Sequence, residues 1–185
     1  MKQTIPAGLI DNQVEIFSIN SAPYTVYKMQ VFSFDRTPKH IINKLIDNMK
    51  SNPTGESSMA RLTGSDDDIV KVKQWMICRF GRLDETPDID FKGEIQDNEY
   101  VPCPLRGECK EEGKGCCLLH VNAETVITKS EMNVLKEVLL PEKLIAEKLF
   151  KSPETIRRHM QTIRTKTRKA NKAELVSWAK DHGVI

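Results

Sequence analysis

The sequence predicts an α+β N-terminal region with a cysteine-rich loop, followed by an all-α domain of four helices that contains a helix-turn-helix. Three observations support this fold class. Apolar residues recur at helical spacing through the last third of the chain, β-branched and aromatic residues gather near the N-terminus, and a turn-rich segment with four cysteines lies between them. The chain of 185 residues suits two small domains, which we expect at residues 1–125 and 126–185.

The charge of the chain is unevenly distributed. Residues 129–181 contain thirteen Lys and Arg against seven Asp and Glu, whereas the whole chain has 28 against 26. By difference, residues 1–128 carry a net charge of −4. A basic end on an acidic body indicates that the C-terminal part meets a polyanion.

The cellular location follows from two features of the sequence. No stretch approaches the roughly 20 apolar residues that span a bilayer. The first residues lack the apolar core of a signal peptide. We therefore expect a cytoplasmic protein that does not bind membranes. In that compartment its five cysteines are expected as thiols or metal ligands rather than as disulfides.

The N-terminal region predicts a strand and then a helix. Residues 24–34 mix β-branched and aromatic side chains with partial alternation, which favours a strand. Thr37 and Pro38 supply a helix start, and apolar residues at three- and four-residue spacing continue an amphipathic helix to Met49.

The segment after this helix is less regular. Residues 51–67 are rich in Ser, Gly, Pro and Asp, so we expect a loop. Residues 69–80 are apolar and fit either a helix or a strand. Turn-forming residues dominate positions 81–114, which indicates that something other than regular structure holds this stretch.

Four cysteines within the loop at about residues 100–120 are candidate metal ligands. Their spacing is C-x5-C-x6-C-C, and the residues are Cys103, Cys109, Cys116 and Cys117. Four soft ligands in a turn-rich segment could close a tetrahedral zinc site, which would also supply folding energy. The same four thiolates could hold an iron–sulfur cluster, which is less favoured than zinc. Unliganded thiols and a single disulfide are the alternatives, and Cys78 could replace one ligand.

The C-terminal segment predicts four helices with recognisable starts. Thr128 and Glu131 form an S/T-x-x-E capping box for the first. Pro141 opens the second, and Ser152 begins a third that continues to Arg168. The fourth begins near residue 171 and ends before the glycine at position 183.

The third helix, residues 152–168, has an apolar stripe and an opposite face that suits DNA. The stripe should pack on the preceding helices and consists of Ile156, Met160, Ile163 and Thr167. The opposite side presents Arg157, Arg158, Gln161, Arg164 and Thr165. Arginine can donate two hydrogen bonds to a guanine edge, and glutamine can pair with adenine. The helix start offers backbone N–H groups and the hydroxyls of Ser152 and Thr155 to a phosphate.

The runs ITKSEMNVLKEVL, IAEKLFKSPETIRRHMQTIRTK and NKAELVSWAKDHGVI resemble the LuxR-type (GerE-like) DNA-binding domain over residues 127–185. The matching positions include Glu131 and the string IAEKLFKSPETIRRH, which combines Ile-Ala, a leucine, Ser-Pro-x-Thr and His159. The sequence departs from the family pattern where Leu140 and Pro141 replace a glycine turn. It departs again where residues 167–169 replace a Leu-Gly-Val.

This resemblance implies that the third helix lies in the major groove of double-stranded DNA and that the fourth supplies a homodimer contact. Arg157, Arg158 and Gln161 would face bases, and Arg164 lies on the same side. The phosphate backbone would be contacted by Ser152, Thr155 and Lys166. His159 matches a position that faces the domain's own core, so it receives no catalytic or metal role.

We therefore expect a sequence-specific DNA-binding transcriptional regulator that forms a homodimer. The apolar residues Leu175, Val176 and Trp178 on the last helix favour the dimer. The alternative is a metal-stabilised adaptor that binds protein and lacks specific DNA binding. We do not expect an enzyme, because the sequence contains no phosphate-binding loop, no G-x-S-x-G elbow and no H-E-x-x-H motif.

Overall fold

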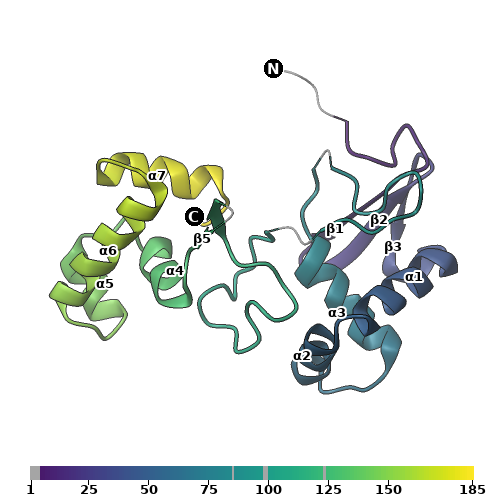
Figure 1. Cartoon of the computed structure of the whole chain (residues 1–185), viewed down its shortest axis with the longest axis horizontal. Helices are drawn as coiled ribbons and strands as arrows, with labels where there is room; N and C mark the ends of the chain where they lie inside the picture. Colours follow the sequence, from purple (N-terminus) through teal and green to yellow (C-terminus); the bar gives the residue numbers. More distant parts are fainter. Residues whose placement is uncertain (1–4, 85, 98–99, 123) are drawn as a thin grey trace. The chain divides into compact units, whose positions relative to one another are not determined.

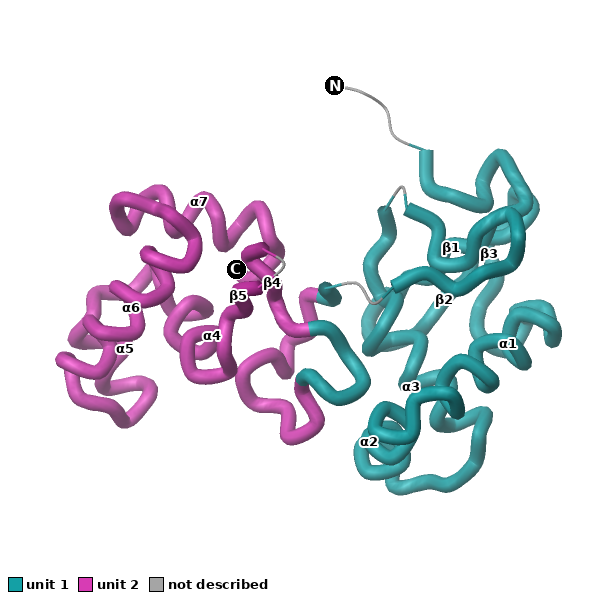
Figure 2. Tube along the Cα trace, viewed as in Figure 1, with its two compact units in different colours: residues 1–101, 113–117 teal, residues 102–112, 118–185 magenta. Residues whose placement is uncertain are grey.

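A computed structural model describes residues 5–84, 86–97, 100–122 and 124–185 (Figure 1). The chain forms two compact units (Figure 2). The sheet unit consists of residues 1–101 and 113–117, and the helical unit consists of residues 102–112 and 118–185. The predicted fold class is confirmed: an N-terminal sheet with helices, a cysteine-containing middle and a C-terminal region of four helices. The chain changes unit within the cysteine-rich segment, and the predicted division at residue 125 stays a prediction.

Three antiparallel strands form the sheet of the first unit, in the order β1-β2-β3. They are β1 (Val14–Ile19), β2 (Ala22–Tyr27) and β3 (Gln30–Ser33). The single strand predicted at residues 24–34 is wrong, because Lys28 and Met29 take left-handed φ angles of 49° and 64° and turn the chain back on itself. Two successive positive φ angles match the right-handed twist of a hairpin.

Three helices belong to the same unit: α3 packs against β1 and β2, and α1 and α2 pack against α3. One of the three replaces a predicted loop. The helix α1 (Lys39–Lys50) confirms the predicted amphipathic helix, and α3 (Asp68–Phe80) settles residues 69–80 as helix. The loop predicted at residues 51–67 is wrong, because α2 (Pro53–Thr63) occupies most of it. A short 3-10 helix, η1 (Phe34–Arg36), joins β3 to α1.

Capping explains why the polar segment before α3 is helical. The Asn52 side chain accepts a hydrogen bond from the Gly55 N–H at 2.9 Å, and Pro53 occupies the first helical position. Gly64 ends the helix with a left-handed φ of 64°. Composition predicted a loop, whereas the positions of Asn, Pro and Gly specify the two ends of a helix.

Trp75 lies at the centre of the core of the sheet unit. Its ring is fully buried, and its indole Nε1–H donates to the Asn48 side chain at 3.1 Å. A Cβ on Gly55 would lie 2.5 Å from the Trp75 ring, so the helix α2 can approach α3 only because residue 55 is glycine.

Turns between residues 81 and 101 are tied to the edge of the sheet. Val14 and Ile89 form an isolated antiparallel bridge, and Ile89 bridges to Ile95. The buried Asp88 carboxylate accepts the Ile16 N–H at 2.6 Å. The prediction that something other than helix or strand holds this turn-rich stretch is confirmed here.

The helical unit contains a small strand pair and four helices. The strands are β4 (His120–Asn122) and β5 (Thr125–Val126), which pair antiparallel. The helices are α4 (Lys129–Lys136), α5 (Glu142–Lys148), α6 (Pro153–Thr167) and α7 (Lys172–Asp181). These four helices match the predicted ones, whereas the strand pair was not predicted. No helix among the described residues is long and apolar enough to cross a membrane.

Because Gly55 touches the Trp75 ring, Gly55→Ala should reduce the stability of the sheet unit by about 2–3 kcal/mol through overpacking. Gly64→Ala is the matched control, since nothing lies within 4 Å of its Cβ and only left-handed strain of about 1 kcal/mol is expected. Urea unfolding followed by tryptophan fluorescence compares them. A native emission spectrum identical to that of the parent and an equal loss in both variants would contradict the close contact.

Candidate nucleic-acid interface

The helix α6 begins with a cap that uses two of the predicted phosphate contacts. Ser152 Oγ accepts the Thr155 N–H at 3.1 Å, and the two hydroxyl oxygens lie 2.8 Å apart. Pro153 occupies the first position of the helix. The hydroxyls therefore stabilise the helix start, and Ser152 remains exposed beside it.

The two faces of α6 agree with those predicted from the spacing of its residues. Its buried residues are Ile156, Met160, Ile163 and Thr167. These residues face α4 and α5, both of which pack against α6. The exposed face carries Arg157, Arg158, Gln161, Arg164 and Thr165. The apolar stripe thus fixes which residues α6 can present to a partner.

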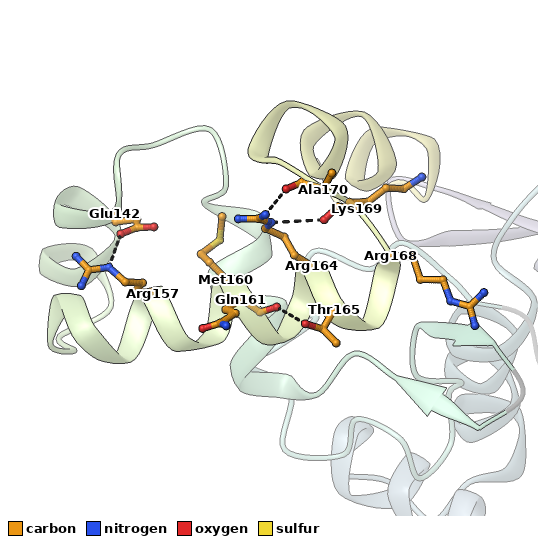
Figure 3. Close-up of a pocket in the computed structure, with 9 residues that line it drawn as sticks. All are labelled: Glu142, Arg157, Met160, Gln161, Arg164, Thr165, Arg168, Lys169 and Ala170. Carbon is orange, nitrogen blue, oxygen red and sulfur yellow. Dashed lines mark hydrogen bonds and ion pairs between the residues drawn. The ribbon is translucent and has the colours of Figure 1, made fainter.

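A basic groove of about 500 Å³ lies along the exposed face of α6 (Figure 3). It is lined by Glu142 from α5, by Arg157, Met160, Gln161, Arg164 and Thr165 from α6, and by Arg168, Lys169 and Ala170 after it. Four of these residues are cationic and one is anionic. Arg168 and Lys169 were missed by sequence reasoning, although the excess of basic residues after position 164 was a signal for them.

Arg157 is held at one end of this groove by two carboxylates. Its Nε lies 3.6 Å from Glu142 Oε2, and its Nη1 lies 3.1 Å from Glu154 Oε2. The Arg157 side chain is 64% exposed, so both ion pairs are weak and a phosphate or base can replace them. The two carboxylates orient the guanidinium, and a ligand can displace them because the ion pairs are exposed.

Arg164 has a more internal role than the spacing alone predicts. Its guanidinium donates to the backbone carbonyls of Lys169 and Ala170, which closes the connection between α6 and α7. These contacts favour a structural role, in which Arg164 shapes the groove.

Lys166 is also bound within the unit. Its ammonium donates to Glu131 Oε2 at 2.6 Å and to the Val126 carbonyl at 2.9 Å. Glu131 belongs to α4 and is 4% exposed. In this placement Lys166 ties α4 to α6. Its contact with a phosphate stays a prediction.

The buried carboxylate of Glu131 accepts several hydrogen bonds. Its Oε2 also accepts the Thr128 N–H at 2.8 Å, which completes the predicted capping box. Burial by itself raises the pKa of the Glu131 carboxyl. The hydrogen bonds from Lys166 and Thr128 outweigh burial, and the pKa lies below its usual value.

The last helix places the residues cited for a homodimer inside the helical unit. Leu175 and Trp178 are buried, and Val176 is half-buried. Trp178 stacks on His182 with the ring centres 4.1 Å apart. These apolar side chains complete the core of the protomer, and the dimer stays a prediction.

The candidate metal ligands are divided between the two units. Cys103 and Cys109 belong to the helical unit, and Cys116 and Cys117 belong to the sheet unit. All four are half-buried, as is Cys78. Within the described residues, no three His, Cys, Asp or Glu side chains come together as a group that could hold a metal ion. The metal site stays a prediction from the spacing of the cysteines.

The segment 102–112, which carries Cys103 and Cys109, is attached to one face of α4. Three α4 side chains at helical spacing donate to its backbone carbonyls. Lys129 donates to Cys109 at 2.5 Å, Asn133 to Gly107 at 3.2 Å and Lys136 to Pro104 at 2.7 Å. A Cβ on Gly107 would lie 1.9 Å from the Asn133 side chain, so the contact requires glycine there.

No protein-family model, curated protein or solved structure matches this chain.

Replacing the buried carboxylate in Glu131→Gln should lower the stability of the helical unit by about 2 kcal/mol at neutral pH. Because the folded pKa of Glu131 is lowered, its stabilisation is present above the unfolded pKa and is lost as the pH falls through the folded value. The difference in the free energy of unfolding between this variant and the parent should therefore become smaller at acid pH. Urea unfolding at several pH values measures it. Glu147→Gln, on an exposed side chain, is the control; a pH-independent difference would contradict the mechanism.

Metal content checks the cysteine prediction directly. Protein purified without oxygen should contain about one zinc per chain and show no visible absorption. Brown protein that contains iron and sulfide would instead indicate an iron–sulfur cluster. Metal-free protein in which all five thiols react would contradict both.

Proposed function

We propose that this protein is a sequence-specific DNA-binding transcriptional regulator that acts in the cytoplasm. The helix α6 would enter the major groove and present Arg157, Arg158 and Gln161 to base edges. The observation that carries the proposal is the basic groove along α6, whose apolar stripe is buried against α4 and α5. A helix that buries one face and exposes arginine and glutamine on the other has the chemistry that base recognition needs.

The connection between α5 and α6 supports the same proposal. Only a few residues separate Lys148, the end of α5, from Pro153, the start of α6, so the pair forms a compact helix-turn-helix. The resemblance of residues 127–185 to LuxR-type DNA-binding domains adds a family in which this pair reads DNA.

Electrostatics favour a polyanion as the partner. Between residues 151 and 172 the sequence has eight basic residues and one acid, Glu154. Binding that neutralises phosphates releases condensed counterions, so the affinity should fall steeply as the salt concentration rises.

A homodimer through the last helix is part of the proposal, but its contact surface differs from the one predicted from the sequence. Because Leu175 and Trp178 are buried in the protomer, a dimer would use exposed positions of α7 such as Ala173 and Ser177. A zinc-bound cysteine segment would serve as a structural element of such a regulator rather than as a reaction centre.

DNA selection from a random duplex library, followed by fluorescence anisotropy on the selected duplex, tests the function. Arg157→Ala should cost about 1–3 kcal/mol on the selected duplex and relax the preference at one base pair. The loss reflects hydrogen bonds to a base edge, which an alanine cannot make.

Lys180→Ala is the matched control, because it removes one exposed positive charge from α7. It should change the affinity for selected and unselected duplexes equally and slightly. Affinity that does not respond to salt, or equal effects of the two substitutions on sequence preference, would contradict DNA recognition by α6 and favour the protein-binding adaptor.

A further inference from the structure

Two bulky residues with left-handed backbone conformations bracket α6. Phe150 precedes the helix with φ = 52°, and Arg168 follows it with φ = 55°. Both are exposed, and Phe150 is 96% exposed, although it is one of the largest apolar side chains of the chain. Left-handed backbone strains any residue that has a Cβ.

Both residues occupy the same position of the same helix-ending motif. After α5, the Phe150 N–H donates to Glu147 O and the Lys151 N–H donates to Ala146 O. After α6, the Arg168 N–H donates to Thr165 O and the Lys169 N–H donates to Arg164 O. These paired bonds define a Schellman motif, whose left-handed position is usually glycine.

The side chains at these positions bring no visible benefit to the fold. A glycine would close either motif without strain, and the Phe150 ring buries almost none of its surface within the unit. The other left-handed residues that are not glycine lie in pairs in the two hairpin turns of the sheet, where two successive positive φ angles match the twist of the strands. Phe150 and Arg168 have no such reason, and strain retained in this way occurs at sites that contact a ligand.

The length of α6 indicates what these residues would meet. Its 15 residues span about 22 Å, whereas the major groove of B-DNA is about 12 Å wide. If α6 is inclined across the groove, its middle faces base edges and its two ends reach the sugar–phosphate backbones on either side. Phe150 lies two residues before the capping Ser152, and Arg168 lines the basic groove.

We propose that Phe150 and Arg168 form a pair of backbone contacts that bracket the reading helix, with Phe150 against a deoxyribose and Arg168 on a phosphate. The inference rests on the proposed DNA binding and adds two residues outside the base-reading set. The contacts are independent of sequence: they strengthen binding to every duplex by the same factor. They also explain why each position carries a side chain that strains the fold.

Binding of the full chain to a mixed-sequence 30-base-pair duplex, followed by anisotropy over a series of salt concentrations, tests the pair. Phe150→Gly should weaken binding about fivefold without changing the salt slope, because the lost contact is apolar and partly buried. Arg168→Gly should weaken binding and reduce the slope by about one counterion. Phe150→Leu, which keeps an apolar side chain, should retain most of the affinity.

Stability separates this contact from an effect on folding. Both glycine variants should raise the melting temperature of the full chain by about 4 °C, since the strain disappears. Leu139→Ala removes another exposed apolar side chain, 62% exposed in the connection from α4 to α5, and should leave the affinity unchanged.

Weaker binding together with higher stability supports the proposal. Unchanged affinity in both glycine variants overturns it while the parent's DNA binding stands. Weaker binding with a lower melting temperature also overturns it, because misfolding then explains the loss. A parent that binds no duplex at low salt overturns the proposed function and this inference together.

Discussion

The orientation of α6 depends on the ion pair between the buried Glu131 carboxylate and the half-buried Lys166 ammonium. The Glu131 carboxylate accepts hydrogen bonds from the Lys166 ammonium at 2.6 Å and from the Thr128 N–H at 2.8 Å. The same ammonium donates a hydrogen bond to Val126 O. One charge pair thus joins the end of β5, the start of α4 and the C-terminal half of α6. Apolar packing alone allows a helix to slide or rotate by small amounts, whereas this ion pair permits few arrangements because separation leaves the buried Glu131 carboxylate without its counter-charge. The exposed face of α6 is oriented by this constraint.

The helix α4 is also held on its other side, by segment 102–112. Lys129, Asn133 and Lys136 lie along its other side and hold the backbone of segment 102–112. A helix of eight residues is too short to be stable by itself, so its position depends on the contacts of both faces. The segment that carries Cys103 and Cys109 is therefore part of the support of α6, even though it precedes the predicted boundary at residue 125.

The sequence predicted the helices of the second unit well and the first unit only in part. Caps such as Thr128 and Ser152 and the stripe from Ile156 to Thr167 are local signals, and local signals can be found without the fold. The helix α2 was missed because its polar composition indicates a loop: its capping residues Asn52 and Gly64 are also common in turns, and the packing of Gly55 on Trp75, twenty residues away, is visible only in the fold. The internal contacts of Arg164 and Lys166 were missed for the same reason: spacing shows that a side chain lies on a face, and only tertiary structure shows what it binds there.

The candidate interface of α6 combines residues that stabilise the fold with residues that strain it. Ser152, Arg164 and Lys166 are engaged in caps and ties that hold the helix, and their contacts with DNA stay predictions. Phe150 and Arg168 do the opposite, because each keeps a left-handed backbone closed by a residue other than glycine. Selection for stability alone would favour glycine at both positions, and a protein that only needs to remain folded gains nothing from an exposed phenylalanine. Strain at both ends of one exposed basic helix is therefore an argument for a ligand along that helix, and it is independent of the charge of the groove.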